Sequence, residues 1–268
     1  MIGQKAIVNQ FNSYDVKNFP QSNLLIGEYG CGKHHLVTML CSKFNIECVD
    51  ISHDISHEFL IDLYLNTTKT AYIIDINEIA KKSRHINKEN ALLKFIEEPP
   101  VNSFVFVLVE HDVQVIDTIK NRCVVWKFAP YIEKELREFK SFNDSRIYNV
   151  LNTPGKLLES SQEEHYVKAF ELCESIINNL PKANVSNVLS LSRYLEEYKL
   201  IELLIILKNV LYNKLMDYDD KHFKAYQLVN ECIEKTFVLN INELYLFCDL
   251  LIKLKTLYDT AGKIKTKY

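Results

Sequence analysis

Three of the six glycines in this 268-residue chain lie within seven residues that could bind a phosphate group. These residues, Gly27-Glu28-Tyr29-Gly30-Cys31-Gly32-Lys33, follow the apolar run Leu24–Ile26 and precede the helical pattern Leu36–Phe44. Glycines let backbone N–H groups converge on phosphate oxygens, and the N-terminus of the following helix adds positive potential. An ordinary glycine turn before a helix is the alternative. The spacing favours a nucleotide site with Gly27, Gly30, Cys31, Gly32 and Lys33 in its loop.

The residue after the loop lysine does not suit magnesium catalysis. A working loop of this kind places Ser or Thr there, whose hydroxyl binds Mg²⁺, and this chain has His34. Imidazole is a poor ligand for Mg²⁺. We therefore expect ATP or ADP to bind with Mg²⁺ weak or absent. His34 would border the nucleotide as a solvent-facing residue of the first helical turn.

A second acidic position follows a predicted strand. The apolar run Ala71–Asp75 ends in a carboxylate, which at the carboxyl end of a parallel strand can hold Mg²⁺ or its water. Hydrolytic sites usually have glutamate next, to polarise the attacking water, and this chain has Ile76. Glu78 is expected to begin the following helix, with a displaced base as the alternative. We predict that Asp75 borders a pocket that binds nucleotide and hydrolyses it poorly.

Residues 1–130 alternate short apolar runs with helical patterns, which is typical of a mostly parallel sheet flanked by helices. The runs suit strands that are buried on both faces. The predicted strands are Asn23–Ile26, Glu47–Ile51, Ala71–Asp75, Ser103–Val109 and Cys123–Phe128. The fold class is therefore α/β, with residues 1–130 as a nucleotide-binding core.

Two helical regions are predicted after this core. Residues 131–161 contain short helical pieces and the turn-forming Asn152-Thr153-Pro154-Gly155, which predicts a small lid. Residues 162–268 are helical throughout, with apolar residues at helical spacing. Examples are Leu200, Leu203, Leu204, Leu207, Val210 and Leu211. We predict an all-α helical bundle for this region.

One string of residues resembles the signature of a known family. Asn90–Pro100, with the sequence NALLKFIEEPP, is similar to the NALLKxLEEPP motif of AAA+ clamp loaders, which include the gamma/tau and delta-prime subunits of bacterial DNA polymerase III. Ile2-Gly3-Gln4 and Thr118–Cys123 resemble two further motifs of that family, in the same order. The resemblance covers residues 1 to about 160. It implies an AAA+ core with the glycine loop as Walker A motif, a lid, and a C-terminal oligomerising collar.

The resemblance also implies roles for two basic residues. Arg122 stands where the family has an arginine finger, which stabilises charge on a γ-phosphate bound by a neighbouring subunit. Lys156 stands in the region that senses nucleotide, at the start of the last lid helix. For Arg122, a surface or lid-bridging role is the alternative.

A basic cluster precedes the signature helix. It consists of Lys81, Lys82, Arg84, His85 and Lys88. By analogy with the family, this region faces primer-template DNA, and contacts to phosphates there would be independent of sequence. A solvated loop is the alternative. The formal net charge of -3 gives the chain no overall attraction to nucleic acid.

The seven cysteines are scattered, without a C-x-x-C pair, which favours reduced thiols and a cytoplasmic protein. The family's gamma and delta-prime subunits usually carry a four-cysteine zinc module between the two nucleotide motifs. Only Cys41 and Cys48 lie in that interval here. We therefore predict no zinc and no other bound metal. The chain also lacks a run of about 20 apolar residues, so no membrane span is expected.

These patterns favour a delta-prime-like clamp-loader subunit with little or no ATPase of its own. It would supply Arg122 to a neighbouring ATPase and help place the sliding clamp on primed DNA. Its expected partners are gamma/tau-type and delta-type subunits, the sliding clamp and, through the assembly, primer-template DNA. A gamma/tau-like motor that hydrolyses ATP is the main alternative. A small-molecule P-loop kinase leaves the clamp-loader motifs unexplained, and the acidic charge disfavours a stand-alone DNA-binding protein.

Overall fold

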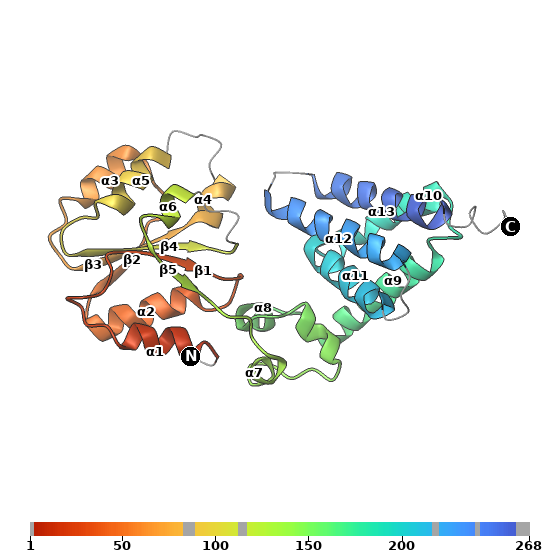
Figure 1. Ribbon diagram of the computed structural model, residues 1–268, viewed down its shortest axis with the longest axis horizontal. Helices are drawn as coiled ribbons and strands as arrows, with labels where there is room; N and C mark the ends of the chain where they lie inside the picture. Colours follow the sequence, from red (N-terminus) through yellow and green to blue (C-terminus); the bar gives the residue numbers. More distant parts are fainter. Residues whose placement is uncertain (1–2, 83–88, 112–116, 216–219, 239–241, 261–268) are drawn as a thin grey trace. The chain divides into compact units, whose positions relative to one another are not determined.

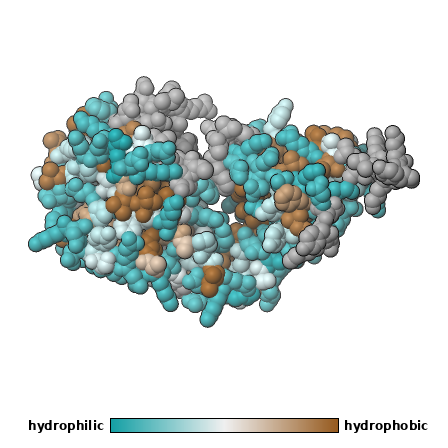
Figure 2. All heavy atoms as spheres, viewed as in Figure 1, coloured by the Kyte–Doolittle hydropathy of each residue, from teal (hydrophilic) through white to brown (hydrophobic). Residues whose placement is uncertain are grey.

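The chain forms two compact units in a computed structural model, which describes residues 3–82, 89–111, 117–215, 220–238 and 242–260. The N-terminal unit comprises residues 1–140 and 152–159, and the C-terminal unit comprises residues 141–151 and 160–268 (Figure 1). The segment 131–161, predicted as a separate lid, contributes residues to both units. On the face drawn in Figure 2, hydrophilic residues predominate and hydrophobic ones form small separate groups.

A five-stranded parallel sheet organises the N-terminal unit. Its strands lie in the order β2-β3-β4-β1-β5, so β4 separates β1 from β3. Their bounds are β1 (Ser22–Ile26), β2 (Glu47–Asp50), β3 (Thr70–Asp75), β4 (Ser103–Val109) and β5 (Val124–Lys127). Every predicted strand is therefore present, with ends shifted by one residue at most. The α/β fold class is confirmed, and all five strands have their carboxyl ends at one edge.

Helices cover both faces of this sheet, as expected for a buried parallel sheet. The helices of this unit are α1 (Lys5–Asn12), α2 (Lys33–Phe44), α3 (His57–Leu63), α4 (Ile76–Lys82), α5 (Glu89–Glu97), α6 (Asp117–Lys120), α7 (Glu133–Arg137) and α8 (Pro154–Leu158). Figure 1 shows α1 and α2 on one face of the sheet and α3 and α5 on the other. Side chains of β1, β3 and β4 alternate between the two cores: Leu25 packs with α1 and α2, and Leu24 with α3 and α5. The sheet is thus fixed from both sides.

The described residues of the C-terminal unit form helices joined by turns and loops, and they contain no strand. Its elements are η3 (Ser145–Asn149), α9 (Glu163–Asn179), α10 (Val185–Leu189), η4 (Ser190–Glu196), α11 (Leu200–Lys214), α12 (Asp220–Val238) and α13 (Glu243–Thr260). The six apolar residues that predicted an amphipathic α11 are all buried. Among the described helices, none is long and apolar enough to cross a membrane.

A buried polar contact ties β1 to the edge strand β5. The indole nitrogen of Trp126 donates to Asn23 Oδ1 over 2.9 Å, and Asn23 Nδ2 donates to the carbonyl of Pro20 over 2.7 Å. Both side chains are buried, so a lost partner would leave a polar group unsatisfied in the core. Asn23 thus couples β1 to β5.

We expect Asn23→Ala to lower the free energy of unfolding of the N-terminal unit by about 2 kcal/mol, because the indole N–H loses its acceptor. Denaturant unfolding can be followed by fluorescence of Trp126, the single tryptophan of the chain. Asn12→Ala, which changes an exposed asparagine, is the control. A loss no larger than that of the control would contradict this role for Asn23.

Candidate nucleotide site

The glycine loop has the predicted strand–loop–helix setting. It leaves β1 at Ile26 and enters α2 at Lys33, with Gly32 as the N-cap residue of the helix. Gly30 and Gly32 have φ angles of 75° and 102°, in the left-handed region that favours glycine. These conformations and the N-terminus of α2 suit the binding of a phosphate group. The loop is therefore a candidate phosphate-binding site.

Lys33 is buried against its own loop. Its ammonium group donates to the carbonyl oxygens of Gly27 and Glu28, over 2.5 Å and 3.1 Å. The side chain is only 6% exposed. A phosphate in the loop would have to replace or share these two hydrogen bonds, since an ammonium group has three donors.

The segment that leads into α8 packs directly on this loop. Thr153 Oγ1 donates to the carbonyl of Tyr29 over 2.7 Å, and the N–H of Gly155 donates to the carbonyl of Gly30 over 3.0 Å. A Cβ atom added to Gly155 would lie 2.4 Å from the Cα atom of Gly30, which no side chain tolerates. The turn predicted at residues 152–155 is thus the start of α8, with Thr153 as its N-cap.

Lys156 neutralises a carboxylate of the glycine loop. Its ammonium group lies 2.8 Å from Glu28 Oε2 and 2.8 Å from Asn152 Oδ1. Burial raises the pKa of Glu28, but the charge of Lys156 and hydrogen bonds from Lys156 and Asn152 outweigh burial and hold this pKa below its ordinary value. The residue predicted as a nucleotide sensor is therefore already paired. The sequence interpretation did not single out Glu28, although a carboxylate in a phosphate-binding loop is an electrostatic conflict that the motif itself displays.

A cavity of about 250 Å³ adjoins the loop. Its lining includes Gly27, Glu28 and Cys31 of the loop together with Glu110, His111 and Tyr131, which the sequence interpretation had not assigned. Burial raises the pKa of Tyr131 to about 12, so its hydroxyl stays protonated and donates to the carbonyl of Cys31 over 2.8 Å. The cavity offers space beside the loop for the rest of a nucleotide.

Gln4 of the predicted I-G-Q motif lies at the end of β5. Its side-chain amide donates to the carbonyl of Ala129 over 2.6 Å and accepts from the N–H of Ala129 over 2.9 Å. Ala129 also lines the cavity. The N-terminal motif thus supports the wall of the candidate site, whereas Ile2 lies outside the described residues.

The two other residues expected at the nucleotide, His34 and Asp75, have side-chain partners outside the glycine loop. His34 is exposed, and its Nε2 lies 3.6 Å from Asp50 Oδ2 at the end of β2. Asp75 ends β3, where its Oδ1 accepts from the N–H of Asn77 over 2.9 Å. Because β4 lies between β3 and β1, a strand separates Asp75 from the glycine loop. Neither position offers the hydroxyl that would bind Mg²⁺ beside Lys33.

Arg122 lies at the opposite edge of the sheet from the loop. It precedes β5, which pairs in parallel with β1, whereas the loop follows β1. The four residues of β5 span about 13 Å at about 3.3 Å per residue. Arg122 Nε lies 3.0 Å from Glu97 Oε2, and Nη1 donates to the carbonyl of Thr118 over 2.9 Å. This arginine is therefore not part of the candidate nucleotide site of its own chain.

The predicted basic cluster lies partly outside the described residues. Lys81 and Lys82 end α4, without described side chains, and Arg84, His85 and Lys88 lie outside the described residues. Among the residues that the structure describes, no three His, Cys, Asp or Glu side chains are grouped to hold a metal. The absence of zinc therefore stays a prediction. Glu78 lies in the first turn of α4, as expected.

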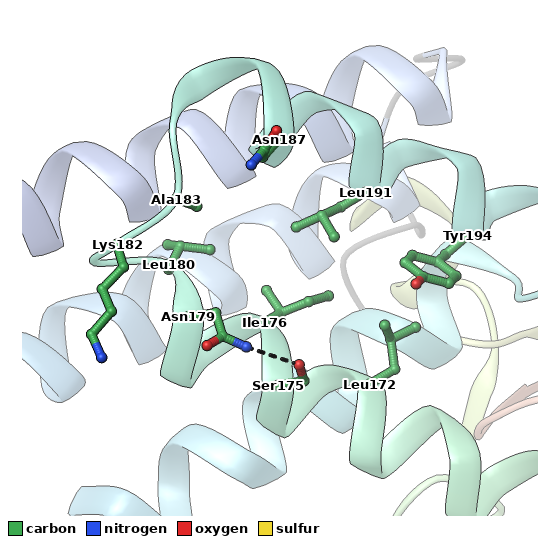
Figure 3. A pocket seen from close by; sticks show the side chains of 10 residues that line it. All are labelled: Leu172, Ser175, Ile176, Asn179, Leu180, Lys182, Ala183, Asn187, Leu191 and Tyr194. Atoms are coloured by element: carbon green, nitrogen blue, oxygen red, sulfur yellow. Dashed lines mark hydrogen bonds between the residues drawn. The ribbon is translucent and has the colours of Figure 1, made fainter.

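A separate cavity of about 340 Å³ lies within the C-terminal unit (Figure 3). Leu172, Ile176 and Leu191 line it with apolar surface, and Asn179 Nδ2 donates to Ser175 Oγ over 3.1 Å at its side. Its lining residues include no glycine, the residue type that lets backbone N–H groups converge on a phosphate. The N-terminal unit therefore carries the stronger candidate site.

Comparisons with known proteins show similarity to subunits of DNA polymerase III. A family model described as "DNA polymerase III, delta subunit" matches residues 41–131. DNA polymerase III subunit gamma of Buchnera aphidicola subsp. Schizaphis graminum is 28% identical over 172 residues, covering 52% of this chain and 47% of that protein. The gamma subunit of Buchnera aphidicola subsp. Acyrthosiphon pisum is 27% identical over 175 residues, covering 53% and 48%. The chain thus spans about half the length of these curated relatives.

Solved structures with similar folds come from Thermotoga maritima. A DNA polymerase III gamma subunit-related protein has a TM-score of 0.44 at 12% identity, covering 95% of this chain and 99% of that one. The RuvB Holliday junction branch migration motor has a TM-score of 0.40 at 19% identity, covering 51% of this chain and 49% of that one.

The parallel sheet, the glycine loop between β1 and α2 and the flanking helices define an α/β fold with a loop of the P-loop type. The signature string, the delta-subunit family model over residues 41–131 and the two gamma-subunit relatives support a relationship to the clamp-loader family.

The Glu28–Lys156 ion pair gives the N-terminal unit a pH dependence. Because the pKa of Glu28 is lowered on folding, the pair stabilises the fold fully above the ordinary pKa of 4.5 and loses this effect as the pH falls through the lowered value. We expect Glu28→Gln to cost less than about 1 kcal/mol at neutral pH, because the carboxylate is 43% exposed, and progressively less as the pH falls below 4.5. Unfolding followed by Trp126 fluorescence measures this cost at each pH, with the exposed Glu47→Gln as control. A pH-independent effect would contradict this account.

Proposed function

We propose that this chain is a delta-prime-like clamp-loader subunit, which donates Arg122 to the ATP bound by a neighbouring subunit and has little ATPase activity of its own. The observation that carries the proposal is the position of Arg122, at the edge of the sheet opposite the glycine loop. A guanidinium there cannot reach the nucleotide of its own loop, so any action on a γ-phosphate must occur in trans.

The candidate nucleotide site supports weak catalysis. His34 in place of Ser or Thr, and Ile76 in place of glutamate, remove a magnesium ligand and the group that would polarise water. Lys33 and Lys156 are both engaged with groups of the loop, so a bound nucleotide would share or replace these contacts. The proposed role is therefore binding of ATP or ADP with slow turnover or none.

The proposed partners follow from this role. They are gamma/tau-type and delta-type clamp-loader subunits, the sliding clamp, and primer-template DNA approached through the assembly. Lys81, Lys82, Arg84 and Lys88 remain proposed DNA-facing residues, and the cytoplasm is the proposed location. In this assembly the chain would help place the sliding clamp on primed DNA during replication.

A gamma/tau-like motor is the second candidate. It is favoured by the names of the two curated relatives, both gamma subunits, and by the retained Lys33 and Asp75. It is opposed by His34 and Ile76. The two candidates differ in one measurable property, the ATPase activity of the isolated chain.

The test combines assembly with hydrolysis. We expect the chain to form a hetero-oligomer with the gamma/tau-type and delta-type subunits of the same genome, as measured by native mass spectrometry. Arg122→Ala should lower the DNA-stimulated ATPase of this assembly by at least about 10-fold, since arginine fingers contribute strongly to phosphoryl transfer. Arg137→Ala, which removes an exposed arginine paired with Glu133, is the control. Failure to assemble, or ATPase of the isolated chain that Arg122→Ala leaves unchanged, would overturn the proposal.

Nucleotide binding has its own prediction. We expect Glu28→Gln to tighten ATP binding by the isolated chain about 3- to 10-fold, because it removes a negative charge beside the phosphates and releases Lys156. Lys33→Ala should abolish binding. Titration with a fluorescent ATP analogue measures both effects, and Glu47→Gln serves as the charge-matched control. If neither the natural chain nor Glu28→Gln binds the analogue, the loop is not a nucleotide site.

A further inference from the structure

A carboxylate from the signature helix contacts the proposed arginine finger. Glu97, the last residue of α5, places Oε2 3.0 Å from Arg122 Nε. The carbonyl of Thr118 in α6 accepts from Arg122 Nη1 over 2.9 Å. Within the described part of the chain, Nη2 has no hydrogen-bond partner. The guanidinium is therefore held along one side while donors on its outer edge stay available.

The two helices that hold Arg122 are themselves fixed to the core. Phe95 and Ile96 of α5 and Ile119 of α6 are buried in the same hydrophobic cluster. Ser22 Oγ at the start of β1 also donates to the carbonyl of Ile96 over 2.5 Å. Glu97 and Arg122 remain partly exposed, with side chains 55% and 33% accessible. The packed helices α5 and α6 thus hold Glu97 and Arg122 at the surface of the unit.

This arrangement suits a group that must act on a neighbouring molecule. A free arginine side chain samples many rotamers, and fixing one of them on binding costs conformational entropy. A carboxylate that already holds Nε reduces this entropy cost. It also leaves the Nη atoms of the guanidinium directed away from the carboxylate. An ordinary surface ion pair would instead contribute little to the stability of the fold and have no effect on a neighbouring molecule.

We propose that Glu97 is a positioning residue, which holds Arg122 through Nε so that its outer nitrogens can meet a γ-phosphate bound by the adjacent subunit. This inference rests on the proposed role of Arg122 in trans. Glu97 does not touch the nucleotide, so its effect is on the rate of hydrolysis in the assembly rather than on the affinity for ATP.

The experiment uses the reconstituted assembly with Glu97→Ala, Glu97→Gln, Arg122→Ala and the double variant Glu97→Ala/Arg122→Ala. Glu97→Ala is expected to lower kcat about 3- to 10-fold and leave KM for ATP within about twofold. Glu97→Gln should restore part of the rate, because its amide oxygen still accepts from Nε without the charge. The double variant should be no slower than Arg122→Ala alone, since Glu97 acts through Arg122.

Glu98→Ala is the matched control, because it removes the same charge one residue further along and leaves kcat unchanged. Native mass spectrometry checks that each variant assembles, and Glu97→Gln keeps the side-chain volume if Glu97→Ala does not. An unchanged or higher kcat in Glu97→Ala and Glu97→Gln, or a double variant slower than Arg122→Ala, overturns the role of Glu97. If Arg122→Ala has no effect, the finger and this inference fail together. If only Arg122→Ala lowers kcat, the finger stands and Glu97 has no positioning role.

Discussion

The parallel direction of all five strands is the constraint on which the rest of this structure depends. It brings every carboxyl end to one edge, where β1 leads into the glycine loop and β3 ends at Asp75. It equally brings the segment before β5, with Arg122, to the other edge. A single chain therefore presents the glycine loop at one edge of the sheet and the partly exposed Arg122 at the other.

Close packing between the loop and α8 is the second determinant. Gly30 and Gly155 approach so closely that neither tolerates a side chain, and Thr153 and Lys156 bond to the same loop. Binding of a nucleotide has to compete with these contacts, so it would shift the segment that carries Lys156. The contacts therefore couple occupancy of the loop to the position of α8.

Several side-chain partnerships had no signal in the sequence. His34 was expected to border the nucleotide, and it lies beside Asp50, which is 16 positions along the chain. The pairing of Arg122 with Glu97 joins two motifs that the sequence separates by 25 positions. Ion pairs between distant segments depend on the rotation of each helix against the sheet. A motif fixes residue types within one segment, and it leaves this rotation open.

The sequence by itself determined the α/β class, the five strands, the amphipathic helices and the loop, because burial periodicity and glycine spacing are local properties. Its strings also sufficed to indicate the clamp-loader family. Only the tertiary structure decided that Lys156 pairs with Glu28, that Gly155 meets Gly30 and that Arg122 is held by Glu97. These contacts join residues from separate elements, and their geometry exists only once the elements have packed around the two faces of the sheet.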